Sequence, residues 1–514
     1  MCKVRTLMTE TSTTVSRMQL LYGLCLAVAA LIGFFIAAPL RYSSVAVLCG
    51  VAGLLMFPWL MKWHRVLLVA SYHSVFVLSF LPGGLPLWCG LAAIGLFMVV
   101  LNRCLSREVT FVHPGGVAWS LLALAVVVVA TAWVQGGVGV RALGSDSYGG
   151  KKYITLLLGV AVYFVMVARP IPRDRARLYM GIFCLSALTK LLSHLLYMAG
   201  SKFYWLFNFI SSDEAYLQAT HEAHAFGDSV FRTTAFSDAA GGVICMLLAM
   251  RGVRGVFDFR KPWYFALVVL SLGVGMIGGF RSFPLAMLGT FGILFFIEGL
   301  HRTRMVALVA ACFVVGGIGL ASFSEQLPIS MQRSLTFLPL KLDAWVRQDA
   351  QGSLDWRIEM WEYMGKEIPG HLMLGKGYAI DPDALRMSWF NSASDYGLKA
   401  EWAALSGAYH NGPLSVLIPF GIWGVLAFGW FLVAGTLRLR WHCRHGDPEL
   451  LNINRALFAF FLVNAFFFIF LNGALYTGMA VFAFLAGLAE SMNASRSPVE
   501  EPAEMEAEDV SDAV

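Results

Sequence analysis

The sequence is poor in charged residues for its length. Only 14% of its 514 residues are Asp, Glu, Lys or Arg, whereas 58% are hydrophobic. A composition this apolar excludes a soluble domain of this size and predicts a chain that crosses a membrane many times. The nine cysteines fall in apolar runs or in basic segments, so nothing indicates a disulfide framework.

Motifs typical of soluble enzymes are also missing. No P-loop, G-x-G-x-x-G or G-x-S-x-G arrangement occurs in a convincing context. Two fragments look like metal sites, Asp381-Pro382-Asp383 and His221-Glu222-Ala223-His224, but the second lacks the H-E-x-x-H spacing. We therefore expect no metal and no cofactor. The net charge of +6 is modest and does not indicate a nucleic-acid partner.

Apolar runs follow one another along the chain, each long enough to cross a bilayer. They predict an all-α polytopic integral membrane protein with about 12–14 transmembrane helices. The first run is expected to stay as a signal anchor. The runs are 18–40, 44–61, 66–82, 85–101, 117–134, 153–168, 178–199, 235–250, 263–279, 283–300, 305–322, 412–435, 456–472 and 474–490.

Basic residues orient these runs. Twenty-two Lys or Arg lie between runs on one side and seven on the other, leaving aside one long loop. The positive-inside rule then places both termini in the cytoplasm and loops 200–234 and 323–411 outside. The longer loop is rich in tryptophan, so we expect it to lie on the bilayer surface. A short amphipathic helix containing Arg357 and Trp361 is predicted within it, ending at Pro369-Gly370.

The expected organisation has four parts. Residues 1–200 form the N-terminal transmembrane helices, and residues 201–435 form a core that includes the outer loop 323–411. Residues 436–490 form the C-terminal transmembrane helices. The tail 491–514 is acidic and is expected to be disordered in the cytoplasm.

Two outward positions combine a chemically useful side chain with an exposed setting. His410 follows the long loop and precedes the polar Asn411. A neutral imidazole there could accept a proton from a sugar hydroxyl, or could simply bond to a nearby carbonyl group. Arg281 lies in a short outward turn after Gly278 and Gly279. It could bind an anion or extend to lipid headgroups.

Four further arginines are candidates for the same anion site. Arg232 precedes run 235–250, Arg357 lies on the predicted loop helix, and Arg333 and Arg347 are weaker candidates from the same loop. Ordinary ion pairs are the alternative. The carboxylates close in sequence are Asp228 and Asp238 for Arg232, and Asp355 and Glu359 for Arg357.

Lys190 and His194 lie one helical turn apart within run 178–199. Ionisable side chains inside a membrane span are candidates for function, and a proton relay would favour a transporter. They could equally face the polar interior of the helix bundle.

Several stretches come in an order that resembles the O-antigen ligase and polymerase family of bacterial envelope glycosyltransferases. The resemblance covers roughly residues 225–430, and Phe280 and Ser282 depart from the family's Ser-Arg-Gly turn. The matching stretches are Arg232-Thr233-Thr234-Ala235-Phe236-Ser237-Asp238, Gly279-Phe280-Arg281-Ser282, Trp356-Arg357-Ile358-Glu359-Met360-Trp361, the Pro369 to Gly377 segment, and His410-Asn411 followed by Gly421 and Gly424.

This resemblance implies a metal-independent glycosyltransferase of the bacterial inner membrane. It would move a glycan from an undecaprenyl-pyrophosphate carrier to a hydroxyl of lipid A core, another glycan or a protein on the periplasmic face. Fixed arginines can neutralise a pyrophosphate leaving group without a metal. The implied catalytic residues are His410 and Arg281, and the implied substrate-binding residues are Arg232, Arg357, Asn411 and Arg333.

Three alternatives remain open from the sequence. A polymerase of O-antigen or exopolysaccharide shares the same motifs as a ligase. A transporter or flippase of glycan lipids should show paired repeats and ionisable residues in several spans. A structural membrane component would not explain the recurring outward arginines.

Overall fold

The computed structural model describes most of the chain from residue 62 onward. The described residues are 62–79, 84–105, 115–139, 148–213, 231–383 and 409–494, with isolated positions at 29, 33, 55, 56, 59, 60, 81, 216, 217, 220, 387, 405 and 407. The chain divides into two compact units, 1–64 and 65–514, and all elements below belong to the second.

Within the described residues, nine helical segments are long and apolar enough to cross a membrane. The predicted all-α polytopic membrane fold is confirmed. These spans are α3 (Leu87–Leu105), α4 (Gly116–Gln135), α5 (Gly150–Val167), the segment Arg173–Ala199, α9 (Thr234–Val256), α12 (Met305–Phe323), α17 (Gly412–His445), α18 (Leu451–Phe470) and α19 (Leu475–Asn493).

Three predicted runs need comment. Runs 18–40 and 44–61 lie almost entirely outside the described residues. The predicted run 66–82 is too long, because its helix ends at Ser71, whose carbonyl oxygen accepts a bond from the Ser74 hydroxyl at 2.8 Å. The chain then forms a two-stranded antiparallel sheet from β1 (Val77–Leu78) and β2 (Leu85–Pro86). The backbone N–H of Val77 donates a bond to the carbonyl oxygen of Phe209, and the backbone N–H of Ser211 donates one to the carbonyl oxygen of Val75. These bonds satisfy backbone polar groups that are no longer part of a helix.

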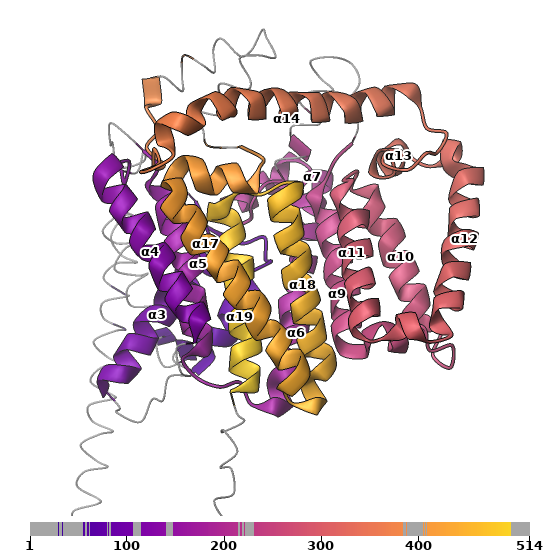
Figure 1. The fold of residues 1–514 in the computed structure, drawn as a ribbon, viewed down its shortest axis with the longest axis horizontal. Coiled ribbons are helices and arrows are strands. Elements are labelled where there is room, and N and C mark those ends of the chain that lie inside the picture. Colours follow the sequence, from indigo (N-terminus) through magenta and orange to yellow (C-terminus); the bar gives the residue numbers. More distant parts are fainter. Residues whose placement is uncertain are drawn as a thin grey trace, which may run out of the picture. The chain divides into compact units, whose positions relative to one another are not determined.

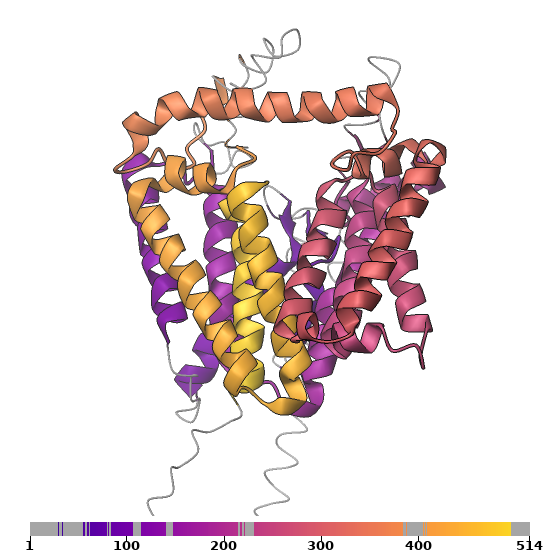
Figure 2. The same ribbon diagram turned by 45° about the vertical axis from the view of Figure 1, so that its right-hand side comes forward.

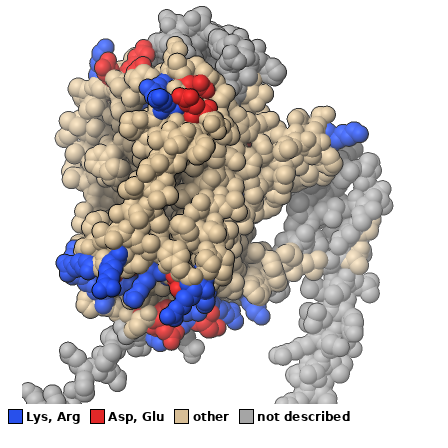
Figure 3. Space-filling model, turned by 90° about the vertical axis from the view of Figure 1, so that its right-hand side faces the viewer, with Lys and Arg blue, Asp and Glu red and all other residues tan. Residues whose placement is uncertain are grey.

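Two shorter apolar helices complete the bundle, α10 (Trp263–Ile277) and α11 (Ser282–Ile297). The segment Arg173–Ala199 consists of α6 (Arg173–Leu185), the 3₁₀ turn η2 (Ser186–Lys190) and α7 (Leu191–Ala199). Figure 3 shows charged side chains gathered at the two ends of the face it presents, with an uncharged band between them. This distribution is the one expected of a membrane-embedded bundle.

The core of the unit lies where α17, α18 and α19 meet. Their phenylalanines pack edge to face, as in Phe461–Phe482 at 5.2 Å between ring centroids. Almost all of α19 is buried, and it packs along α5. Gly487 makes this possible, because an added Cβ would lie 2.8 Å from the Cβ of Met166.

In the described part of the long loop, the helix α14 (Ala344–His371) runs across one end of the bundle (Figures 1 and 2). We call this end the site end. The helix is longer than predicted and continues through Pro369. Pro369 has no backbone N–H to bond to the Gly365 carbonyl oxygen, and the helix ends two residues after it. Met360 and Met364 are fully buried against Tyr409 and Ile418, so α14 packs against the start of α17.

Candidate functional site

Arg232 is held at the start of α9. The next residue, Thr233, caps the helix, and its hydroxyl donates a 2.7 Å bond to the buried carboxylate of Asp213. The same carboxylate oxygen accepts a 2.7 Å bond from the backbone N–H of Thr234. One acidic side chain from the preceding segment therefore satisfies an unpaired backbone donor of the helix and also bonds to the capping hydroxyl. This network anchors the backbone on which Arg232 lies.

The α10–α11 turn brings Arg281 to the same place. The backbone N–H of Thr233 donates a 3.1 Å bond to the carbonyl oxygen of Gly278. Gly279 adopts φ 75°, and a Cβ added there would lie 2.9 Å from the carbonyl oxygen of Phe231 and 3.5 Å from Cγ of Arg232. Only glycine permits this approach. The segment carrying Arg232 and the turn carrying Arg281 are thus in direct contact.

Arg333 connects this turn to α14. It lies on the short helix α13 (Ile329–Ser334), and its side chain is 5% exposed. Nη1 donates a 2.8 Å bond to the carbonyl oxygen of Gly279, and Nε donates a 2.6 Å bond to the carboxylate of Asp349 on α14. A buried, doubly bonded guanidinium of this kind fixes the relative positions of its neighbours.

Arg281, Arg333 and Arg357 form an electrostatically coupled group, which we call the arginine group. Burial lowers the pKa of Arg281, and the charges of Arg333 and Arg357 lower it further, while Asp349 opposes the shift. Burial and then the charge of Arg333 lower the pKa of Arg357. Three guanidiniums beside one carboxylate leave an excess of positive charge. Such a group is suited to an anion that carries several negative charges.

His410 has an unusual backbone. Its φ is 46°, the only positive value for a non-glycine residue in the described part of the chain. The side chain of Asn411 caps α17 by accepting a 2.9 Å bond from the N–H of Leu414. The carbonyl oxygen of Tyr409 accepts a 3.3 Å bond from Nε1 of Trp361 on α14. A strained residue held between two such contacts is often a functional one.

The surroundings of His410 lower the pKa of its imidazole. The ring of Trp356 meets it edge to face, with 5.2 Å between centroids. Burial lowers the pKa of His410 and the charge of Arg357 lowers it further, whereas a hydrogen bond with the Asn472 side chain raises it. His410 and Asn472 line a cavity of about 350 Å³. A neutral imidazole facing a cavity can accept a proton.

Helix α14 joins the two halves of the site. Adjacent residues on it, Trp356 and Arg357, contact the His410 ring and contribute to the arginine group, respectively. Of the residues predicted from the sequence, Arg281, Arg333 and Arg357 are brought together near His410, and Arg232 lies beside the Gly279 turn. That Arg232, Arg281 and Arg357 converge on a pyrophosphate stays a prediction. For Asn411 the structure shows a helix-capping contact, and its part in binding substrate stays a prediction.

Sequence reasoning missed two residues of the site. Asp349 lies eight residues before Arg357 on α14 and bonds to Arg333. Asn472 lies in the turn between α18 and α19, where the predicted runs 456–472 and 474–490 meet. The signal in the sequence that could have identified Asn472 was a polar side chain in a very short turn at the site end.

The other sequence candidates have different surroundings. Lys190 forms an ion pair with Asp238, so Asp238 is bonded across the bundle and is not simply the local partner of Arg232. The ring of His194 lies among aromatic rings, with Phe236 at 4.9 Å between centroids. These contacts indicate that Lys190 and His194 each face the interior of the bundle. They do not favour a proton relay between the two side chains.

Of the two metal-like fragments, the structure describes only Asp381-Pro382-Asp383. Oδ1 of Asp381 accepts a 2.9 Å bond from the backbone N–H of Asp383, which is a local turn. The His221–His224 fragment lies outside the described residues. Among the residues that the structure describes, no group of three potential metal ligands is found.

The segment with these features has a counterpart in a known family. Residues 266–429 match the O-antigen ligase family. The O-antigen ligase match includes Arg281, Arg333, Arg357 and His410 and confirms the resemblance found in the sequence, whereas Arg232 lies before it. It indicates a membrane glycosyltransferase of the ligase or polymerase type. No curated protein shows a significant match to the chain.

Proposed function

We propose that this protein transfers a glycan from an undecaprenyl-pyrophosphate carrier to an acceptor hydroxyl on the periplasmic face of the bacterial inner membrane. The observation that supports this most is the connection made by α14, on which Trp356 contacts the His410 ring and the adjacent Arg357 belongs to the arginine group. The arginine group is suited to a polyanionic leaving group, and His410 is suited to a hydroxyl nucleophile.

The arginine group binds the pyrophosphate in this proposal. Arg281 and Arg357 provide planar guanidiniums that can each donate two bonds to phosphate oxygens. Arg333 is already bonded to Gly279 and Asp349, so it acts mainly through its charge and by positioning the turn. Arg232, beside that turn, adds a further positive charge. No metal is required, because fixed cations already face the charge that develops on the leaving group.

His410 acts on the acceptor. Its neutral imidazole takes the proton of an acceptor hydroxyl as that oxygen attacks the anomeric carbon of the glycan. The bond between this carbon and the pyrophosphate oxygen breaks, and the electron pair leaves with the pyrophosphate. The arginine group stabilises the negative charge that appears there. The products are the glycosylated acceptor, undecaprenyl pyrophosphate and a protonated His410, which then loses its proton to solvent.

His410→Ala in purified protein tests this proposal. We expect turnover to fall by about a hundred- to ten-thousandfold, while binding of undecaprenyl pyrophosphate is retained. The control is His371→Ala, at the end of α14, where the side chain contacts Glu367. It should leave turnover near the wild-type value. Near-normal turnover by His410→Ala would contradict the catalytic role, and loss of binding and turnover together would indicate a structural one.

The same site chemistry serves a polymerase, so the acceptor is tested separately. A deletion strain that retains long carrier-linked chains without glycan on the final acceptor indicates a ligase. Accumulation of single carrier-linked units indicates a polymerase. A transporter of glycan lipids would release no sugar-free carrier in the purified system.

A further inference from the structure

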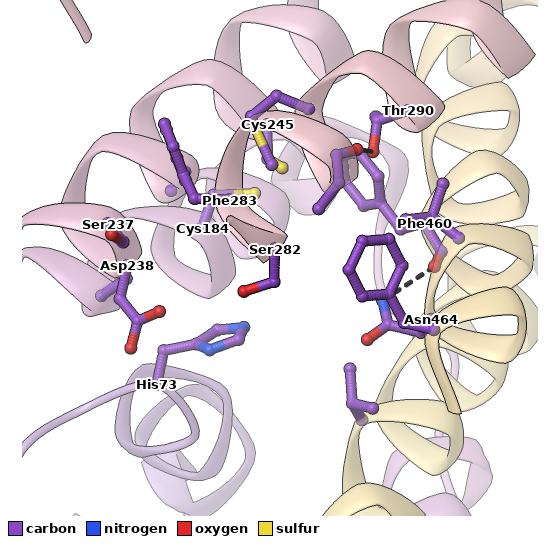
Figure 4. Close-up of a pocket in the computed structure, with 18 of the residues that line it drawn as sticks. His73, Cys184, Ser237, Asp238, Cys245, Ser282, Phe283, Thr290, Phe460 and Asn464 are labelled. Carbon is purple, nitrogen blue, oxygen red and sulfur yellow. Dashed lines mark hydrogen bonds between the residues drawn. The ribbon is translucent and has the colours of Figure 1, made fainter. Parts of the chain in front are cut away.

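A second, larger cavity of about 570 Å³ lies among η2, α9, α11, α18 and α19. In Figure 4, Asp238, His73 and Ser282 point into this space from one side and Asn464 from the other. The volume falls in the range of about 300–1,000 Å³ that is typical of small-molecule sites. A space of this size with convergent polar groups needs a functional explanation.

The cavity adjoins both parts of the proposed site. Phe280 and Ser282, the two neighbours of Arg281, line its wall. Asn472 and Asn464 line both this cavity and the smaller one that contains His410. A group bound here would therefore lie next to the place where the pyrophosphate and the acceptor hydroxyl meet.

The charge in this cavity is balanced, unlike that of the arginine group. Lys190 and Asp238 form an ion pair across the wall, with side chains 32% and 40% exposed. A balanced pair does not select for net charge. It offers a strong acceptor and a strong donor to hydroxyl groups, and both remain accessible. These properties favour an uncharged, hydroxylated ligand over an anion.

Other polar groups on the wall fall into two classes. Nδ2 of Asn464 donates a 2.8 Å bond to the carbonyl oxygen of Phe460, which leaves its amide oxygen directed into the cavity (Figure 4). The hydroxyls of Ser237 and Thr290 are bonded to backbone carbonyls at 2.9 and 2.8 Å. Asn464 is therefore available to a ligand, whereas the Thr290 hydroxyl is engaged by its own helix.

We propose that this cavity binds one uncharged sugar residue next to the reacting bond, with Lys190, Asp238 and Asn464 contacting its hydroxyls. Phenylalanines such as Phe280 and Phe467 provide apolar walls for its C–H faces. The inference rests on the proposed function. The sugar is either the donor residue bonded to the pyrophosphate or the acceptor residue, since both present the same hydroxyl chemistry.

A purely structural ion pair is the competing explanation, and a double variant separates the two. Removing one member of such a pair leaves an uncompensated charge, and removing both relieves it. The variants are Lys190→Met, Asp238→Asn and the two combined. Thr290→Val is the matched control, because it lies on the same wall with its hydroxyl already bonded.

The experiment uses purified protein in nanodiscs, with donor and acceptor extracted from native membranes. Thermal stability, binding of sugar-free undecaprenyl pyrophosphate, and turnover at varied donor and acceptor concentration are measured. We expect kcat/KM to fall about tenfold or more in both single variants and at least as far in the double variant. Carrier binding and the Thr290→Val control should stay within about twofold of wild type.

The outcomes are distinguishable. A rise in KM for the donor identifies the donor sugar, and a rise in KM for the acceptor identifies the acceptor sugar. Recovery of wild-type turnover in the double variant would overturn the inference in favour of a structural pair, as would normal turnover in all three variants. If wild-type protein binds no undecaprenyl pyrophosphate, the proposed function itself fails.

Discussion

Nη1 of Arg333 donates a 2.8 Å hydrogen bond to the carbonyl oxygen of Gly279, 54 residues earlier in the chain. This bond joins α13 to the turn that carries Arg281. The second bond of Arg333, to Asp349, extends the connection to α14. The relative positions of Arg281 and Arg357 therefore depend on the buried guanidinium of Arg333, which bonds to Gly279 and Asp349.

Replacing Arg333 should lower stability as well as activity. Arg333→Met leaves Asp349 and the Gly279 carbonyl oxygen without their partner, and we expect a loss of roughly 2–4 kcal/mol, at the lower end of values for buried pairs because Asp349 is partly exposed. Arg347→Ala, at an exposed position on α14, is the control and should stay within about 0.5 kcal/mol. Thermal or denaturant unfolding of both variants measures this. Equal stabilities would contradict the bridging role of Arg333.

Gly279 should tolerate no side chain. Gly279→Ala places a Cβ 2.9 Å from the carbonyl oxygen of Phe231 at φ 75°, and we expect a cost of about 1–3 kcal/mol and weaker carrier binding. Gly316→Ala on α12 is the control, because no atom outside its own helix lies within 4 Å. Unfolding and binding of undecaprenyl pyrophosphate are measured on both. Unchanged carrier binding in Gly279→Ala would show that the turn does not position the arginines.

Arg281 should require its guanidinium and not only its charge. Lysine keeps the charge but loses the two-pronged geometry, so we expect Arg281→Lys to weaken binding of undecaprenyl pyrophosphate and Arg281→Ala to weaken it further, by about ten- to a hundredfold. Lys202→Ala, an exposed cation at the site end, should have no effect. If alanine variants of Arg232, Arg281 and Arg357 all bind normally, the anion site lies elsewhere.

The pH profile of turnover should respond to Asn472. The pKa of His410 is held below its ordinary value by burial and by Arg357. Turnover should therefore persist below about pH 6.5 and fall only when the imidazole becomes protonated. Asn472→Asp places a carboxylate beside the ring, raises this pKa and moves the acid limb to higher pH. Asn472→Leu removes the hydrogen bond that raises the pKa and moves the limb to lower pH.

The measurement is kcat/KM from about pH 4.5 to 8 for wild type and the two Asn472 variants. Opposite shifts by Asp and Leu support a titrating His410 in contact with Asn472. An acid limb that stays in place in both variants would mean that another group controls the reaction.

Some errors of the sequence reading have local causes. The helix predicted in the long loop was too short, because α14 begins at Ala344, and its end at His371 lies one residue beyond the predicted Pro369-Gly370. Pro369 lacks the N–H that would bond to the Gly365 carbonyl oxygen, which weakens the last turn of the helix. The predicted run 66–82 was too long because its apolar residues include the short strand β1, whose Val77 N–H bonds to the distant Phe209. Hydrophobicity alone does not distinguish a membrane-spanning helix from a helix followed by a short apolar strand.

By itself the sequence determined that this is a polytopic helical membrane protein and which side chains on one side could carry chemistry. Both conclusions depend on local properties, the length of apolar runs and the bias of basic residues. Only the tertiary structure decided that Asp238 pairs with Lys190, that Asp349 bonds to Arg333 and that Asn472 lies beside His410. These contacts join residues 16 to 62 positions apart. They depend on how helices pack, and no local pattern encodes which polar side chains then meet.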